Sequence, residues 1–350
     1  MERSRLRAIC ALALLLSFMS TNTYPFERPS AVTADGGGVA LTATGRVFPE
    51  SLEGTSRMRM DQNGNTYVLN AKDSSIRVYD RSFKFVRRIG SLGQGPDDLR
   101  HPSDFAVDRS GQLIIADTDN NRIQIMSPSG KSLRAIKFRQ PYSVDVLSTG
   151  EIVATSRQDR ELIRLISREG VQLANIGEPV STGYEESFLE LHVAINRGSL
   201  LVDDHDYIYW IGNSVPTPTV RKYSRDGKLL LEFHPGGRAL SAEAEVARER
   251  LRQSYEAHIA KMNVVLHTVR VNPKTGDIWV LPAAPRLDIY DSNGNLKQEF
   301  QLRSDRPIGG RDIMILNDGR FILANFIDGG YLFKEPKDLN SNSAAKRRSR

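Results

Sequence analysis

Charged and hydroxyl side chains recur at one position ahead of a series of glycines. Arg57, Asp104 and Asp312 each stand seven residues before a glycine. Paired carboxylates beside arginines can bind a polar or zwitterionic ligand, and carboxylate oxygens can also hold a divalent cation. Arg311 adds a second cation next to Asp312. The residues that share this position are Arg57, Asp104, Ser143, Thr268 and Asp312.

A second row of polar residues follows thirteen positions later, at Asn70, Asp117, Ser156 and Asn325. At Asp117, as at the nearby Arg122, we favour a structural role, because these residue types cap turns and pair neighbouring strands. For the first row a structural role is an equal alternative. The residues that we predict to bind a ligand are Arg57, Asp104, Arg311, Asp312, Asn70 and Asn325.

Histidines offer a different chemistry, because three converging imidazoles can hold zinc or another divalent metal. His101, His192 and His267 all lie at the beginnings of repeats or in long connections. They are our predicted ligands for such a metal. No two ligands stand at a close metal-binding spacing, so unrelated surface or core histidines are the favoured alternative. Apart from this metal, we expect no cofactor.

Other catalytic signatures are missing from the sequence. It has no Gly-x-Ser-x-Gly elbow, no phosphate-binding Gly-x-x-x-x-Gly-Lys-Ser/Thr and no His-Glu-x-x-His. The single cysteine, Cys10, lies near the amino terminus within an apolar segment. Thiol nucleophiles, thiolate metal sites and disulfides are therefore excluded from the rest of the chain.

The candidate residues are set in a repeated pattern of short alternating runs. A phrase of apolar, polar, apolar and bulky residues begins at positions 76, 123, 163, 220, 287 and 330, at intervals of 47, 40, 57, 67 and 43 residues. Two further alternating runs, joined at a turn, precede most copies of this phrase. We therefore predict that each repeat forms four antiparallel strands. Such spacing predicts an all-β, six-bladed β-propeller. We place this domain at 41–336 and expect Leu41–Pro49 to supply the outer strand of the last blade.

Two stretches carry a resemblance to a known family. The segment LIIADTDNNRIQIMSPSGK, at 113–131, resembles an NHL repeat, and IGSLGQGPDDLRHPSDFAVDRSG, at 89–111, is similar to bacterial exported six-bladed propellers of that group. The resemblance extends in outline over about 55–335. It implies the fold and a monomer. NHL-type propellers include protein-binding and RNA-binding modules and peptidyl-hydroxyglycine lyases, so it leaves the function open.

Long connections gather at one end of the predicted blades, which we call the top, where the innermost strands begin. They are 90–102, 177–198, 212–219 and 238–263. Ala244, Ala247 and Leu251 are spaced at helical intervals in the last of these, which predicts an amphipathic helix between blades four and five. That helix would serve as a strut at the propeller edge, as a lid over the channel or as a partner-binding helix.

Charge and the two ends of the chain bear on location. Of the net charge of +6, residues 1–23 contribute +2 and the last five residues +4, so the body between them is neutral. Nucleic acid is thus not an expected partner. Residues 1–23 have the pattern of a signal peptide, with cleavage after Ala34 as an alternative. We expect an exported protein, periplasmic or secreted, with no transmembrane segment after signal removal and a disordered basic tail at 337–350.

Two hypotheses of function follow. The first is a non-enzymatic module that binds a protein, peptide or glycan ligand on its top face, which we favour because the catalytic signatures are missing. The second is a metal-dependent lyase or hydrolase in the central funnel. It requires His101, His192, His267, Asp104 and Asp312 to converge.

Overall fold

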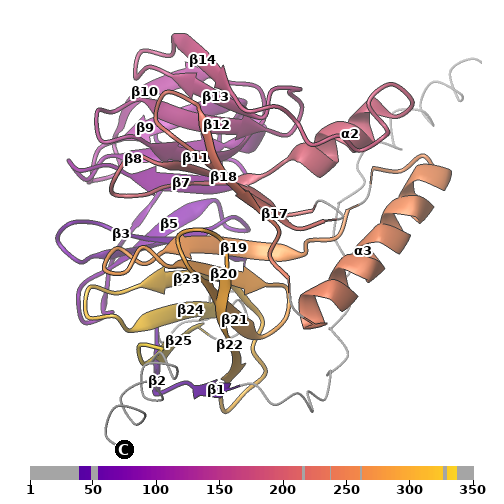
Figure 1. Ribbon diagram of the computed structural model, residues 1–350. Helices are drawn as coiled ribbons and strands as arrows, with labels where there is room; N and C mark the ends of the chain where they lie inside the picture. Colours follow the sequence, from indigo (N-terminus) through magenta and orange to yellow (C-terminus); the bar gives the residue numbers. More distant parts are fainter. Residues whose placement is uncertain are drawn as a thin grey trace, which may run out of the picture. The chain divides into compact units, whose positions relative to one another are not determined.

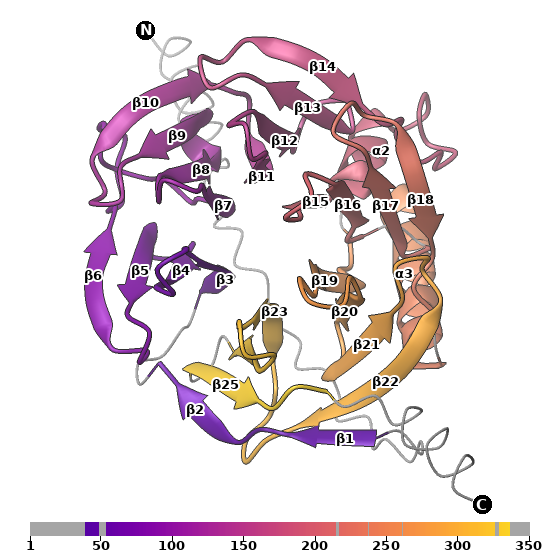
Figure 2. The ribbon, with the colours of Figure 1, turned by 60° about the vertical axis from the view of Figure 1, so that its left-hand side comes forward.

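Six β-sheets stand around a common centre in the computed structural model (Figures 1 and 2), which describes residues 39–48, 54–214, 217–236, 238–260, 262–325 and 329–336. Each sheet is an antiparallel meander of consecutive strands, apart from additions at two outer edges. The predicted six-bladed propeller is confirmed. The predicted signal peptide at 1–23 and the tail at 337–350 lie outside the described residues.

The blades follow one another in chain order. Blade one contains β3 (Thr55–Met60), β4 (Thr66–Asn70), β5 (Ser75–Tyr79) and β6 (Phe85–Ile89). Blade two contains β7 (Asp104–Val107), β8 (Leu113–Asp117), β9 (Arg122–Met126) and β10 (Ser132–Lys137). Blade three contains β11 (Pro141–Val146), β12 (Ile152–Ser156), β13 (Ile163–Ile166) and β14 (Gln172–Ile176). Blade four contains β15 (Ser199–Val202), β16 (Ile208–Gly212), β17 (Thr219–Tyr223) and β18 (Leu229–Phe233). Blade five contains β19 (Leu266–Val271), β20 (Ile278–Pro282), β21 (Arg286–Tyr290) and β22 (Leu296–Arg303). Blade six contains β23 (Gly310–Ile315), β24 (Phe321–Asn325) and β25 (Gly329–Phe333). A 3-10 turn (Thr118–Asn120) separates β8 from β9.

Apolar side chains on both faces of the sheets hold the ring together. All five residues of the second strand are buried in each blade, as in β8, whose sequence is LIIAD. The buried side chains form six clusters, and each cluster joins two neighbouring blades. Ile114 of blade two, for example, shares a cluster with Ile152 of blade three. Radial packing thus removes from water both faces of sheets that could not be stable alone.

The amino-terminal strands close the ring. β2 (Gly45–Val47) pairs antiparallel with β25, with Arg46 opposite Tyr331, and supplies the outer strand of blade six. The predicted closure by the Leu41–Pro49 segment is therefore confirmed for residues 45–47, whereas Leu41 and Thr42 belong to a strand of blade five. One feature was not predicted: β1 (Val39–Thr42) pairs in parallel with β22 and adds a fifth strand to blade five.

Two helices lie on one side of the ring (Figure 1). α3 (Arg238–Glu256) connects blades four and five, as predicted, and buries Ala247 and Leu251 against the cores on either side of blade four. α2 (Leu189–Asn196), which connects blades three and four, was not predicted. The ring of Tyr184, just before α2, stacks on that of Tyr255 of α3 at 4.7 Å between centroids.

The contacts of α3 bear on its role. Its outer face pairs Arg248 with Glu245 and Arg252 with Glu249, as in a solvated helix. The helix ends at Glu256, before the predicted end, and Ile259 is 58% exposed. Because its apolar face belongs to the blade cores, α3 acts as a strut. None of the helices within the described residues could span a membrane.

Candidate functional site at the central channel

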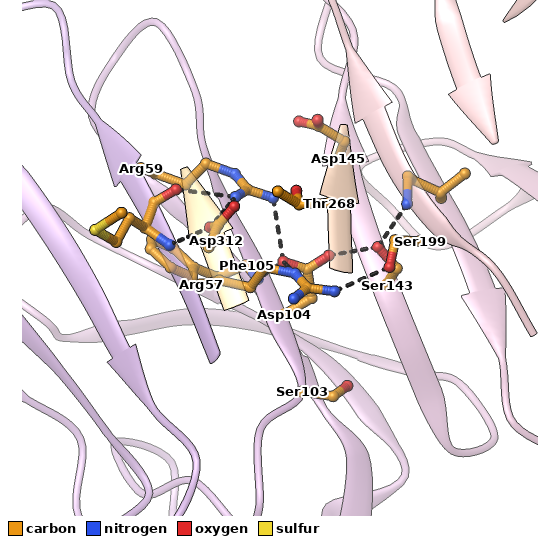
Figure 3. Close-up of polar contacts among 12 residues, drawn as sticks. Arg57, Arg59, Ser103, Asp104, Phe105, Ser143, Asp145, Ser199, Thr268 and Asp312 are labelled. Atoms are coloured by element: carbon orange, nitrogen blue, oxygen red, sulfur yellow. Dashed lines mark hydrogen bonds and ion pairs between the residues drawn. The ribbon is translucent and has the colours of Figure 1, made fainter. Parts of the chain in front are cut away.

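Strand pairing places six polar residues at one level of the innermost strands. Arg57 lies opposite Leu69, Asp104 opposite Ala116 and Asp312 opposite Ala324, in each case the fourth residue of the second strand. Ser199, which the sequence alignment omitted, occupies the same position in blade four. The level therefore consists of Arg57, Asp104, Ser143, Ser199, Thr268 and Asp312 (Figure 3).

Asp104 binds side chains from the blades on both sides of it. Its carboxylate is fully buried and accepts a hydrogen bond from Arg59 Nη2 at 3.1 Å. Arg57 Nε lies 3.5 Å away, and Ser143 donates its hydroxyl hydrogen from blade three. Arg57 in turn donates to Ser199 Oγ across the channel at 2.9 Å.

Asp312 makes the corresponding contacts on the other side of the ring. It accepts a hydrogen bond from Arg270 Nη2 at 2.6 Å and one from the backbone N–H of Met58 at 2.7 Å. Arg59 Nη1 lies 3.8 Å away and so connects both carboxylates. We call Arg57, Arg59, Asp104, Arg270 and Asp312 the central belt.

The central belt is a set of compensated charges. Burial alone would lower the pKa of Arg57, but the carboxylates of Asp104 and Asp312 raise it above its ordinary value. Buried carboxylates that accept several charged hydrogen bonds hold their partners in place and are poorly suited to move protons. The belt thus positions side chains of blades one, two, five and six relative to one another.

The predicted asparagines also have partners within the protein. Asn70 Oδ1 accepts the backbone N–H groups of Lys72 and Asp73, and Asn325 Nδ2 donates to Pro307 O at 3.2 Å. These contacts fix turns at the top of blades one and six. Ligand binding by Asp104, Asp312, Asn70 and Asn325 remains a prediction.

Asp117 and Arg122 hold the long top connection 90–102. Arg122 Nε donates to Asp117 Oδ2 at 2.7 Å, and Arg122 Nη2 donates to Gly95 O at 2.9 Å and to Asp98 O at 2.8 Å. Asp117 Oδ1 accepts the backbone N–H of Arg100. These contacts fit the structural role favoured for both residues.

The three candidate metal ligands have different partners. His101 Nδ1 lies 2.7 Å from Asp119 Oδ2 and is well exposed, whereas His192 of α2 is buried with its Nδ1 2.8 Å from Thr182 Oγ1. His267 lies in β19 near Arg57 and Arg311. Among the residues with described positions, no three or more His, Cys, Asp or Glu side chains could together hold a metal ion. The three imidazoles therefore do not fit one shared metal site, and metal binding stays a prediction.

The pairing between the first and second strands is irregular at the top of several blades. The register shifts just before the polar level in blades one, three, five and six, and in the last three the shift falls at Tyr142, His267 and Arg311. A bulge of this kind re-aims a side chain that regular alternation would send into the blade. We call Tyr142, His267, Arg311 and the arginines around them, Arg57, Arg157 and Arg197, the upper opening.

The upper opening is rich in cations. The guanidinium carbon of Arg197 lies 5.0 Å from the ring centroid of Tyr142, and that of Arg157 lies 5.7 Å from it. Burial lowers the pKa of His267 to about 3, with a further effect of the positive charges of Arg311 and Arg57. His267 is therefore neutral at neutral pH. Burial and the charge of Arg57 also lower the pKa of Arg311.

A cavity of about 650 Å³ lies at the other end of the channel, where the inner strands end. Its lining includes Arg59, Asp145, Arg270, Tyr207 and Lys222. Asp145 accepts the backbone N–H groups of Val146 and Val202, and burial raises its pKa. We call this space the lower cavity.

Several residues of the channel were missed in the sequence. Arg59 and Arg270 stand two positions after Arg57 and Thr268, on the same face of their strands. Extending the aligned position by two residues could have found them, because side chains on one face of a strand recur with period two. Tyr142, Arg157 and Arg197 gave no signal, since bulges and ring contacts depend on local register.

Comparisons with known proteins agree with the fold. The model of the NHL repeat family matches residues 99–126, which span the top of blade two to the end of β9. A comparison with curated proteins gives no match. The match to the NHL repeat model and the six blades confirm the resemblance to NHL-type propellers.

Solved structures with a similar fold have different functions. A streptogramin B lyase superposes with a TM-score of 0.53 at 14% identity, covering 79% of this chain and 78% of the lyase. A catalytically inactive histidine-to-alanine variant of virginiamycin B lyase from Staphylococcus aureus, with quinupristin, gives 0.54 at 13%, covering 81% and 80%. The extracellular domain assigned to a hybrid two component system of B. thetaiotaomicron gives 0.50 at 12%, with 81% of this chain covering 34% of that one. At these identities the likeness shows the fold alone.

Proposed function

We propose that this NHL-repeat propeller is a binding module whose top face receives a protein, peptide or glycan. The observation that carries the proposal is the central belt. Asp104 and Asp312 are the carboxylates best placed for acid–base catalysis at the channel centre. Both are buried, and both accept hydrogen bonds from arginines or backbone N–H groups. A rigid scaffold with engaged central charges and an enlarged face suits recognition better than proton transfer.

The top face offers the material for such recognition. Leu92, in the connection 90–102, is 64% exposed, and Ile259, just beyond α3, is 58% exposed. The upper opening lies on the same side, where the inner strands begin. Exposed apolar residues that flank a polar opening are typical of binding surfaces. We further propose that the protein is exported and works as a monomer.

Peptide and glycan arrays probed with the full chain test the proposal, followed by calorimetric titration of the ligands that bind. Leu92→Ser and Ile259→Ser should each weaken binding about fivefold or more, the range for truncating an interface residue. Leu173→Ser is the matched control, because Leu173 is 51% exposed on the outer strand β14. Binding that is lost only in the Leu173 variant would overturn the top-face assignment.

A lyase acting in the channel is the second candidate, and His267 is the observation that favours it. A neutral imidazole at a bulge of β19 could accept a hydrogen bond from a substrate group, although a pKa of about 3 makes it a weak base for proton abstraction. Incubation with quinupristin, followed by mass spectrometry, tests this function. Conversion of quinupristin to a new product that is lost in His267→Gln would favour the lyase over the binding module. An unchanged substrate would remove this reaction.

A further inference from the structure

Most of the charged side chains that line the lower cavity already have partners. Arg59 and Arg270 donate to the carboxylates of the central belt, and Asp203 accepts a tyrosine hydroxyl and two backbone N–H groups. Asp204 and Lys274 are exposed, so water solvates them. Among the residues described at this cavity, two charged side chains remain, one of each sign.

The negative one is Asp145, a carboxylate that is only 8% exposed. It accepts the backbone N–H groups of Val146 at 2.9 Å and Val202 at 2.8 Å, and it forms no ion pair within the described part of the chain. Figure 3 shows it apart from the contacts of the central belt. A carboxylate has room for about four hydrogen bonds, and burial raises the pKa of this one. A bound cation would offset that cost of burial.

The positive one is Lys222, whose ammonium group is held by aromatic rings. Its Nζ lies 3.8 Å from the ring centroid of Tyr207 and 5.4 Å from that of Tyr209, and burial lowers its pKa. Among the described residues it donates no hydrogen bond and forms no ion pair. A cation–π contact positions an ammonium group but supplies no hydrogen-bond acceptor to its three N–H donors. Lys222 can therefore donate to an acceptor in the cavity.

Strand pairing sets the separation of these two charges. Leu201, Tyr209 and Lys222 lie opposite one another on β15, β16 and β17. Asp145 binds the backbone of β15 at Val202, whereas the Lys222 ammonium lies over a tyrosine of β16. Neighbouring strands are about 5 Å apart, so one to two strand spacings, about 5–10 Å, separate the charges. An extended chain covers roughly 3.3–3.6 Å per residue, so the ends of a di- or tripeptide match this separation.

We infer that the lower cavity binds a linear zwitterion, either a di- or tripeptide with both ends free or an ω-amino acid of similar length, with its ammonium group at Asp145 and its carboxylate at Lys222. This site is separate from the top face and does not depend on the proposed function. A ligand with one charge would leave the other protein group without a partner, which is costly where water is excluded. The volume of about 650 Å³ is typical of small-molecule sites, and Met58, Met60 and Met314 supply apolar contacts for the ligand's backbone.

Calorimetric titration of the full chain with triglycine tests the inference. Triglycine and diglycine should bind, and acetylation of the amino end or amidation of the carboxyl end should each weaken binding roughly ten- to a hundredfold, the range for losing a hydrogen bond to a charged group. Glycine, whose two charges are too close together, should bind as weakly as the blocked peptides. Equal affinity for free and blocked triglycine would overturn the inference.

Variants assign each end of the ligand to a residue. Lys222→Met should weaken triglycine to the affinity of the amidated peptide, and it should not weaken the amidated peptide further. Asp145→Asn should act in the same way on triglycine and its acetylated form. Lys137→Met is the matched control, because Lys137 is an exposed lysine of the outer strand β10. A variant that weakens free and blocked peptides alike would show that its side chain does not bind that end, and would overturn the assignment.

Further outcomes identify the source of the zwitterion. 6-Aminohexanoate has the same two ends without peptide groups, so binding of this compound as tightly as triglycine would support the zwitterion site and favour an ω-amino acid. Binding of triglycine alone would support the site and favour a peptide. Failure of both compounds would overturn the inference.

The top-face variant separates this inference from the proposed function. Leu92→Ser should leave triglycine binding unchanged. Triglycine binding that is lost in Leu92→Ser and kept in Lys222→Met would overturn the lower site and leave the top-face module standing. Failure of all array ligands at the top face, with triglycine binding intact, would remove the proposed function and leave the lower site.

Discussion

The two ends of the central channel differ in how their charges are balanced. At the upper opening, Arg157, Arg197 and Arg311 gather around Tyr142, and Asp104 and Asp312 below them are bound within the central belt. The lower cavity mixes the two signs of charge: Arg59, Arg270 and Lys222 line it together with Asp145, Asp203 and Asp204. One end gathers cations around an aromatic ring, and the other mixes cations with carboxylates.

The difference arises from local register rather than from composition. Regular alternation continues to the bottom of the inner strands, so the residues at the lower cavity keep their places in the pleat. At the top, the register shifts in four blades, and in three of them the shift takes Tyr142, His267 and Arg311 out of that alternation. The central belt separates the two ends and fixes the blades that carry them. Two distinct surfaces can therefore be built on one ring of repeated strands.

The largest expected effect comes from breaking the central belt that separates the two ends. Asp312→Asn removes the charge that faces Arg270 and Arg59 in a buried setting. Leaving a buried charge without its partner costs about 3–5 kcal/mol, so the free energy of unfolding should fall by that amount. Urea denaturation followed by tryptophan fluorescence measures it. We expect the upper opening and the lower cavity to unfold in the same transition.

Asp318→Asn is the control for that prediction. Asp318 pairs with Arg320 at 2.7 Å in an exposed position, and such pairs contribute about 1 kcal/mol or less. If the two variants prove equally stable, the belt is not what holds the channel together. The contrast between its two ends would then need another cause.

Much of this architecture could be predicted from the amino-acid sequence, because it rests on local pattern. Alternating apolar residues in β8 and β12 mark strands that are buried on both faces. The spacing of Ala244, Ala247 and Leu251 predicts α3. The parallel pairing of β1 with β22 joins segments about 260 residues apart and left no such pattern. α2 has a weakly amphipathic sequence, since Leu191, His192 and Asn196 are all buried.

The candidate site was predictable only in part. Aligning the repeats identified Arg57, Asp104 and Asp312 as equivalent, which strand pairing supports. It did not show that arginines of neighbouring blades bind the two carboxylates, because contacts between blades depend on side-chain rotamers. The cation-rich upper opening could not be predicted from the sequence for a related reason. Arg157 and Arg197 come from different connections and meet only at Tyr142.

A smaller effect, at the upper opening alone, is expected from pH. The pKa of His267 is lowered from 6.5 to about 3, so the folded protein binds this proton less tightly than the unfolded chain does. The free energy of unfolding should therefore fall as the pH drops from about 6.5 toward 3, and the loss should be smaller in His267→Gln. Denaturation at a series of pH values measures both.

Comparing the two proteins isolates His267 from other titrating groups. Burial raises the pKa of Asp288 to about 6, which makes the folded state bind a proton more tightly and opposes the trend between about pH 6 and 4. This contribution is present in both proteins and cancels in their difference. Parallel pH profiles for wild type and variant would show that His267 keeps an ordinary pKa and is less buried than the structure indicates.

The smallest effect on stability, and the sharpest on the comparison, should come from one cation at each end. Arg197 contacts Tyr142, and the Lys222 ammonium lies 3.8 Å from the ring centroid of Tyr207 and makes no hydrogen bond or ion pair among the described residues. Arg197→Met and Lys222→Met should each lower the free energy of unfolding by about 1 kcal/mol or less, the usual size of a cation–π contact. Urea denaturation of the two variants measures both losses. A loss well above 1 kcal/mol in only one variant would mean that the cations at the two ends of the channel are held differently from what these ring contacts indicate.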